Sequence, residues 1–120
     1  KKYRKPVGLY TLGNKEPLLQ RLVESGIEIV MPIQDSMEKI SRLKEKWRGK
    51  ITFIGGPSQA SLRSCHMDEL EKEIKVLHEI GIKGGGYVIS SCLGMEEKVS
   101  SQYVISLLQA MHQGGKQAAA

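Results

Sequence analysis

The sequence predicts an α/β fold in which strands and helices alternate along the chain. Four short apolar runs are each followed by a segment with the apolar spacing of an amphipathic helix. A glycine follows each of these helical segments, as expected for a left-handed helix C-cap. The apolar runs are continuous rather than alternating, which is typical of strands covered on both faces. Regular alternation of this kind implies a parallel sheet with right-handed crossovers.

The elements follow one another as four strand–helix units. The predicted strands are Pro6–Tyr10, Ile27–Met31, Ile51–Ile54 and Tyr87–Ile89. The predicted helices end at Gly26, Gly49, Gly81 and Gly114. Asp35, with Glu38 three residues later, resembles a capping box at the start of the second helix.

The length of the chain, 120 residues and 13.3 kDa, suits one small domain. Residues 1–113 are predicted to fold as this domain. Residues 114–120 (GGKQAAA) are small and aperiodic, and they predict a disordered tail or linker. Four parallel strands fit either an open α/β sandwich or half of a (β/α)8 barrel, because a full barrel needs roughly 250 residues.

The net charge of +5 comes from an excess of basic residues in the first 50 positions. Nucleic acid is not favoured as a partner, because aromatic residues make up only 5% and no recognition motif accompanies the charge. The basic residues of the second helix are expected on its solvated face, namely Lys39, Arg42, Lys44, Lys46 and Arg48. No apolar run approaches the ~20 residues of a membrane helix, and no leader segment is recognised. Two distant cysteines, Cys65 and Cys92, favour a reducing cytoplasm over a disulfide scaffold.

Candidate functional residues lie in the loops after the strands, because ligands bind at the carboxyl ends of strands in both architectures. These loops contain amides, hydroxyls and one thiol, and they carry few charges. Asn14 and Asp35 are also explained by helix capping. Cys92 suits either a reactive thiol or a small half-buried filler. The three histidines lie outside these loops, so no metal site is expected.

Four segments together resemble a known family. They are residues 6–14 (PVGLYTLGN), 22–34 (LVESGIEIVMPIQ), 49–56 (GKITFIGG) and 85–94 (GGYVISSCLG), followed by the helix from Ser100. In this order and spacing they resemble the C-terminal half of the uroporphyrinogen decarboxylase superfamily, which includes cobalamin-dependent methyltransferases. The family fold is a (β/α)8 barrel, so the resemblance implies a (βα)4 half of a TIM-type barrel with parallel strands.

The resemblance implies a parent activity that is incomplete in this chain, either tetrapyrrole decarboxylation by a lyase or corrinoid-linked methyl transfer by a methyltransferase. Methyltransferases of the family hold zinc with a His-x-Cys on the first of these strands and a Cys in the last loop. This chain has Tyr10-Thr11-Leu12 at the first position, so neither zinc nor corrinoid is expected on it. Decarboxylases carry Gly-His-Gly in the last loop, where this chain has Cys92-Leu93-Gly94. Ser58 stands near the position of a decarboxylase Asp.

The resemblance also implies roles for the loop residues. Asn14, Gln34, Ser58 and Ser90 would donate hydrogen bonds to a large anionic small molecule such as a tetrapyrrole, and Cys92 would be the reactive group. A half-barrel leaves two sheet edges open, so we expect a missing N-terminal half-barrel or a homodimer as partner. The alternative is a non-catalytic binding or interaction domain that kept the fold and lost the catalytic residues.

Overall fold

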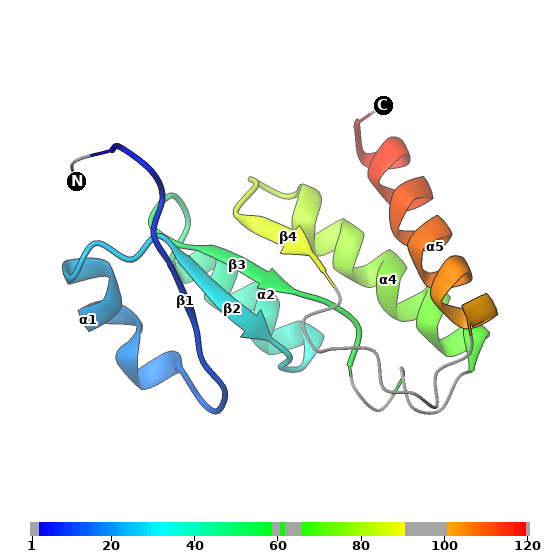
Figure 1. The fold of residues 1–120 in the computed structure, drawn as a ribbon, viewed down its shortest axis with the longest axis horizontal. Helices are drawn as coiled ribbons and strands as arrows, with labels where there is room; N and C mark the ends of the chain where they lie inside the picture. Colours follow the sequence, from blue (N-terminus) through cyan, green and yellow to red (C-terminus); the bar gives the residue numbers. More distant parts are fainter. Residues whose placement is uncertain (1–2, 59–60, 62–65, 91–100, 120) are drawn as a thin grey trace.

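The computed structural model describes residues 3–58, 61, 66–90 and 101–119, and all structural statements concern these residues. Strands and helices alternate along the chain (Figure 1). The strands are β1 (Gly8–Tyr10), β2 (Ile29–Ile33), β3 (Thr52–Gly55) and β4 (Tyr87–Ile89). The helical elements are the 3-10 turn η1 (Glu16–Leu18), α1 (Leu19–Glu24), α2 (Met37–Lys46), α4 (Met67–Ile82) and α5 (Ser101–Ala119).

The four strands form one sheet in the order β1-β2-β3-β4, and every neighbouring pair is parallel. The predicted α/β class with a parallel sheet is therefore confirmed. Each predicted strand is found within two residues of its expected position. The register between β2 and β3 shifts between Val30 and Ile33, which marks a bulge near the carboxyl end of β2.

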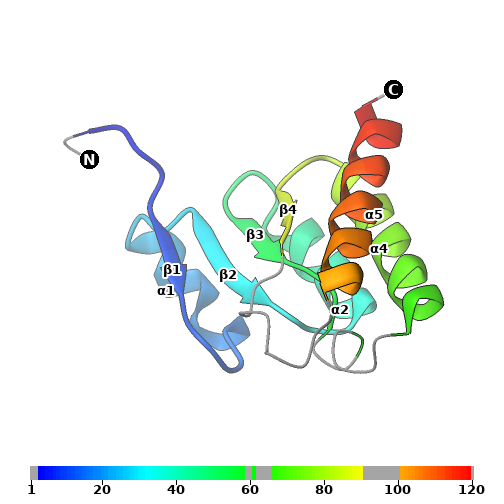
Figure 2. The same ribbon diagram turned by 45° about the vertical axis from the view of Figure 1, so that its right-hand side comes forward.

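One face of the sheet packs against helices. Val30 and Phe53 lie side by side in the register and are fully buried in the main core. Leu19 of α1, Ile40 of α2 and Leu77 of α4 belong to the same core cluster. These three helices therefore cover the same side of the sheet, as the two ribbon views also show (Figures 1 and 2).

The second face of the sheet is only half-covered in the described part of the chain. Tyr10 pairs with Met31 in the register, and Ile54 pairs with Val88. Tyr10 and Val88 are 56% and 46% exposed, whereas Met31 and Ile54 are half-buried. The continuous apolar strand sequences predicted two covered faces, but the described helices cover one.

The helix α5 packs against α4 rather than directly on the sheet (Figure 1). A second core cluster holds this contact together, with Leu70 and Ile74 of α4 against Tyr103 and Leu107 of α5. All four side chains are at most 4% exposed. The last helix is thus attached to the rest of the fold through α4.

Two of the four predicted glycine caps are confirmed and two are wrong. Gly26 and Gly49 have φ values of 84° and 73°, the left-handed conformation that ends a helix. Gly81 lies inside α4, which continues to Ile82. Gly114 lies inside α5, which runs to Ala119, so residues 114–119 are helical where the sequence predicted a disordered tail or linker. The sequence after the glycines is rich in Gln, Lys and Ala, which are strong helix formers.

Two expectations for α2 are also wrong. Its N-cap is Ser36 rather than Asp35, because the Ser36 hydroxyl accepts a hydrogen bond from the Lys39 amide at 3.3 Å. Asp35 instead pairs with the Lys39 ammonium at 2.9 Å. Lys44 was expected on the solvated face but is only 6% exposed, because it faces α4.

Candidate functional site

The strand-end residues singled out in the sequence follow the carboxyl ends of their strands. Gln34 directly follows β2, Ser90 directly follows β4, and Ser58 lies three residues after β3. Because all four strands are parallel, these positions and Asn14 belong to the same edge of the sheet. Asn14 and Gln34 are exposed, whereas Ser58 and Ser90 are half-buried. Cys92, the predicted reactive group, lies outside the described residues.

A backbone hydrogen bond joins the third and fourth loops of this edge. The Ser90 amide donates to the Gly55 carbonyl at 2.8 Å, which extends the β3–β4 pairing past the end of β4. Gly55 itself is buried at the end of β3, where it pairs with Ile33 of β2 and Ile89 of β4. A Cβ at this position would collide with the Ile33 carbonyl and lie 2.9 Å from the Tyr87 hydroxyl. The glycine therefore permits a backbone approach that any larger residue would prevent.

Asn14 has a local structural role. Its side-chain Oδ1 accepts a hydrogen bond from the Glu16 amide at 3.2 Å, just before η1 begins. The N-cap position of η1 is held by Lys15 without a side-chain cap, so Asn14 forms a turn before the helix and the capping interpretation of Asn14 is wrong. The neighbouring Lys15 is buried and donates to the Gly13 carbonyl at 3.0 Å.

Ser58 belongs to a hydrogen-bond network that attaches the third loop to two helices. Its amide donates to Oε1 of Glu73 in α4 at 2.8 Å. Its hydroxyl accepts from the Ser61 amide at 3.1 Å and lies 2.9 Å from the Ser61 hydroxyl. The Tyr103 hydroxyl of α5 donates to the Ser61 carbonyl at 2.9 Å. Much of the hydrogen-bonding capacity of Ser58 is therefore used to shape the loop.

Glu73 was not recognised from the sequence as part of this edge. Its Oε2 is buried and has no hydrogen-bond partner among the described atoms, which is uncommon for a carboxylate. A signal was present in the spacing, because Glu73 occurs with Leu70, Ile74 and Leu77 at positions i, i+3, i+4 and i+7 of one helix face. A single acid within an apolar stripe marks a side chain directed toward the protein interior.

An ion pair lies beside the first loop and connects η1 with α2. Arg42 holds Glu16 with two hydrogen bonds, at 2.8 Å and 3.2 Å. The Arg42 guanidinium lowers the pKa of Glu16, and Glu16 raises the pKa of Arg42. This pair fixes the position of η1 relative to α2, so it supports the geometry of the loop that contains Asn14.

A zinc site does not fit the residues present at the first strand. Tyr10, Thr11 and Leu12 occupy the place of the family's His-x-Cys, and the Thr11 hydroxyl donates to the Leu12 carbonyl at 3.4 Å. A phenol, a hydroxyl and an aliphatic group do not form the nitrogen and sulfur ligand set that zinc requires. Over residues 3–58, 61, 66–90 and 101–119, no three His, Cys, Asp or Glu side chains come together as metal ligands.

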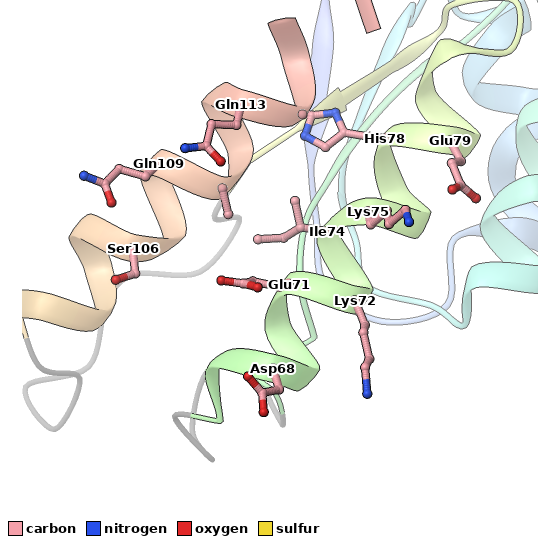
Figure 3. A pocket seen from close by; sticks show the side chains of 12 residues that line it. Asp68, Glu71, Lys72, Ile74, Lys75, His78, Glu79, Ser106, Gln109 and Gln113 are labelled. Carbon is pink, nitrogen blue, oxygen red and sulfur yellow. The ribbon is translucent and has the colours of Figure 1, made fainter. Parts of the chain in front are cut away.

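A hollow with a volume of about 760 Å³ lies elsewhere, between α4 and α5 (Figure 3). Its α4 wall carries charges of both signs, including Glu71 and Lys75, together with His78. Its α5 wall carries uncharged side chains such as Ser106 and Gln113. Small-molecule pockets are mostly apolar with a few polar groups. The mixed lining indicates a solvated groove between two helices, so the strand-end edge remains the candidate site.

Comparison of the chain with protein-family models, curated proteins and solved structures gives no match. No described helix is long and apolar enough to cross a membrane. The described strand-end groups are amides and hydroxyls, which can orient a polar ligand by hydrogen bonds.

Proposed function

We propose that this chain is a uroporphyrinogen-decarboxylase-like half of a (β/α)8 barrel. Its strand-end loops would form part of a site for a large anionic small molecule such as a tetrapyrrole. The observation that carries the proposal is the unbroken order β1-β2-β3-β4 of a wholly parallel sheet. In doubly wound sheets the strand order reverses at a switch point, with helices on both faces. A barrel instead adds its strands in sequence and keeps its helices outside.

The placement of the helices supports the same choice. The helices α1, α2 and α4 contribute to one core on one face of the sheet. The other face carries half-exposed side chains that point where the interior of a barrel would lie, among them Tyr10, Met31 and Ile54. In a TIM barrel this interior is filled by branched and bulky side chains in layers.

The chemistry of the strand ends suits binding by hydrogen bonds. Gln34 is an exposed amide directly after β2, and Ser90 is a half-buried hydroxyl directly after β4. The net charge of +5 would attract a ligand with several carboxylates. In the proposal, Gln34, Ser90, Asn14 and Ser58 orient the ligand and the Cys92 thiol is the reactive group. The two distant cysteines make a cytoplasmic location part of the proposal.

The parent reaction would be tetrapyrrole decarboxylation or corrinoid-linked methyl transfer. The alternative is a binding or interaction domain that kept the fold without the chemistry. The hydrogen bonds of Asn14 and Ser58 within the fold favour this alternative, because groups used for local structure are less able to serve a reaction. Both versions share the strand-end edge as the ligand site.

The binding claim is tested with uroporphyrin, an octacarboxylate tetrapyrrole, by titration of its visible absorption spectrum with the protein. We expect a saturable spectral change that its uncharged octamethyl ester does not give. Gln34→Ala should weaken binding several-fold, whereas Gln113→Ala, an exposed amide on α5, should leave it unchanged. Equal binding of the acid and the ester, or no binding, would contradict the proposal.

The choice between enzyme and binding domain requires a second measurement. The protein is incubated with reduced uroporphyrinogen, and the products are separated by their number of carboxylates. Product formation that is lost in Cys92→Ser supports a catalytic role for Cys92. Product formation that survives this substitution removes Cys92 from the mechanism. Saturable binding without product favours the binding domain.

A further inference from the structure

We infer that Tyr10 is a ligand-binding residue of the strand-end site, where its ring forms a flat platform for the macrocycle of the tetrapyrrole. The inference rests on the proposed function and deepens it, because it names what the site would recognise besides the carboxylates. The hydrogen-bonding side chains would hold the acid groups, and Tyr10 would select a flat ring system over a flexible polycarboxylate.

Tyr10 is the last residue of β1, so it lies at the carboxyl edge of the sheet. It pairs with Met31 of β2, and the pairing continues one residue further, where the Thr11 amide donates to the Met31 carbonyl at 3.0 Å. The loop after Tyr10 carries Asn14, and Gln34 directly follows β2. The main chain therefore holds Tyr10 beside the two loops that carry these proposed ligand-binding residues.

The direction of the Tyr10 side chain follows from the register of the strands. Leu9 pairs with Val30, which is fully buried under the helices, so the next residue, Tyr10, points to the opposite face of the sheet. Tyr10 is 56% exposed there, whereas Tyr103 in the contact between α4 and α5 is buried. Over the part of the chain that the structure describes, the Tyr10 hydroxyl makes no hydrogen bond. Its ring and its hydroxyl can therefore both contact a ligand.

This direction does not depend on what lies beside β1. A further strand would pair with the main chain of β1 along its edge, whereas the side chains of a strand stand roughly perpendicular to the sheet. In a closed barrel, residues at the carboxyl ends of the strands face the ligand site formed by the following loops. Tyr10 would line this site whether the rest of the barrel comes from the same polypeptide or from another.

The spread of the candidate residues over the sheet requires a large ligand. Val88 of β4 lies on the same face as Tyr10, and Ser90 falls on this face by strand alternation. From β1 to β4 the sheet spans three strand spacings of about 4.8 Å, which is roughly 14 Å in total. A ligand that contacts both Tyr10 and Ser90 must bridge this distance, as a macrocycle with acidic side chains can and a small metabolite cannot.

The residue types suit a flat, acidic macrocycle. Aromatic rings stack on other π-systems, and tyrosine adds a hydroxyl that can donate a hydrogen bond to a carboxylate. Leu12, in the loop after β1, is 65% exposed and adds apolar surface. Gln34 and Ser90 provide further donors. An apolar surface with a few polar groups is the usual composition of a small-molecule site.

The first experiment locates the ligand by NMR of protein labelled in its four tyrosine rings, with uroporphyrin as the probe. The ring current of a macrocycle shifts protons above its plane strongly to high field. The Tyr10 signals, assigned by their loss in Tyr10→Phe, should therefore move upfield, whereas those of Tyr103, buried between α4 and α5, should not move. Saturable binding without an upfield shift of the Tyr10 signals overturns the inference.

The second experiment compares uroporphyrin affinities by titration of the visible absorption spectrum. Tyr10→Leu removes the ring but keeps an apolar side chain, and it should weaken binding about 2- to 10-fold, the usual contribution of an aromatic pair. Tyr10→Phe keeps the ring and should lose less affinity than Tyr10→Leu. The matched control Tyr3→Leu changes an exposed tyrosine outside the strands and should bind as the parent does.

Stability measurements separate a ligand platform from a packing role. Because Tyr10 is more than half-exposed, Tyr10→Leu should keep the circular dichroism and the melting temperature of the parent. A Tyr10→Leu protein that melts at a lower temperature and binds uroporphyrin with the parent's affinity would assign the ring to packing inside the barrel, which overturns the inference.

The same titrations distinguish failure of this inference from failure of the proposed function. A parent protein that binds no uroporphyrin contradicts the proposed ligand and the platform together. Binding that is weakened by Gln34→Ala and unchanged by Tyr10→Leu supports the strand-end site and refutes the platform alone. Binding that is weakened by Tyr10→Leu and unchanged by Gln34→Ala supports the platform and refutes the role of Gln34.

Discussion

The Lys44 ammonium of α2 donates a hydrogen bond to the main-chain carbonyl of Ile80 near the end of α4. The same ammonium donates to the carbonyls of Lys83 and, at 3.3 Å, of Gly81. The last carbonyls of a helix lack partners within the helix and carry partial negative charge. A lysine from a neighbouring helix therefore provides the C-terminal cap of α4.

Replacement of Lys44 by Met should destabilise the protein by about 1–3 kcal/mol, the usual cost of leaving buried polar groups without partners. Methionine keeps a similar length and apolar stem, so the loss reports the ammonium group rather than the packing. Lys50→Met changes an exposed lysine near the end of α2 and should alter the free energy of unfolding by less than about 0.5 kcal/mol. Denaturant unfolding measures the change in the free energy of unfolding for both variants. Equal changes would show that Lys44 does not stabilise the end of α4.

The stability of the protein should also depend on alkaline pH through Lys44. Burial lowers the pKa of Lys44 below its ordinary value of 10.5. Between the lowered pKa and 10.5, the unfolded chain binds more protons than the folded protein, so the contribution of Lys44 to stability rises with pH in this window. The free energy of unfolding is measured against pH for the parent and for Lys44→Met, and the difference between the two curves isolates this contribution. A stability difference that is constant with pH would contradict the lowered pKa.

Much of this fold followed from the sequence because the strands and their order depend on local signals. Gly26 and Gly49 end their helices as predicted because each takes a positive φ. Gly81 does not end α4, since the left-handed glycines come later, at Gly84, Gly85 and Gly86, and Lys44 from α2 caps the carbonyls at this helix end. Such contacts between distant segments have no local signature.

The site was less predictable for the same reason. Lys44 lies four residues after Ile40, on the helix face that also carries Leu43 and Trp47. Its burial could therefore be inferred from helical spacing, although its charge suggested exposure. The burial of Glu73 could be inferred from its spacing in α4 in the same way. The strand-end positions were predictable from topology, but the network of Ser58, Ser61 and Glu73 depends on where a loop meets a helix.

The ion pair between Glu16 and Arg42 predicts a stability change at acidic pH. The pKa of Glu16 is lowered, chiefly by its hydrogen bonds to Arg42, so the pair stabilises the fold above the ordinary carboxyl pKa of 4.5. This contribution should disappear as the pH falls through the lowered pKa. Glu16→Gln should therefore be less stable than the parent at neutral pH and equally stable in strong acid. Because both groups are solvated, high salt should reduce the neutral-pH difference. If the stability difference between the parent and Glu16→Gln persists in strong acid, the effect comes from packing and not from the ion pair.

Two glycines should respond to alanine with opposite signs. Gly55→Ala forces a Cβ against the Ile33 carbonyl and should destabilise the protein by about 1–3 kcal/mol. Gly81→Ala adds a methyl group within α4, where the nearest atom is 3.7 Å away, and should stabilise by about 0.5–1 kcal/mol. Tyr87→Phe removes the second clash at Gly55 but not the backbone clash, so it should not rescue Gly55→Ala. If the double variant Gly55→Ala/Tyr87→Phe regains the stability of the parent, the close contact between Gly55 and the Ile33 carbonyl tolerates a side chain.

Gly114 and Gly115 provide a matched pair within α5. A Cβ on Gly114 would collide with the imidazole of His78, whereas one on Gly115 meets nothing within 4 Å. Gly115→Ala should therefore stabilise by about 0.5–1 kcal/mol, the gain of alanine in a helix. Gly114→Ala should not be stabilised in this way, because His78 must leave its position between the helices to make room for the methyl group.

A double-mutant cycle with His78→Ala separates the clash from helix propensity. In the His78→Ala background, Gly114→Ala should stabilise as much as Gly115→Ala does, which gives a coupling of about 0.5–3 kcal/mol between positions 78 and 114. If Gly114→Ala has the same effect with and without His78, the close approach of α5 to α4 at this point is refuted. Because α5 is attached through α4, that result would also undermine the packing of Tyr103 and Leu107 against α4.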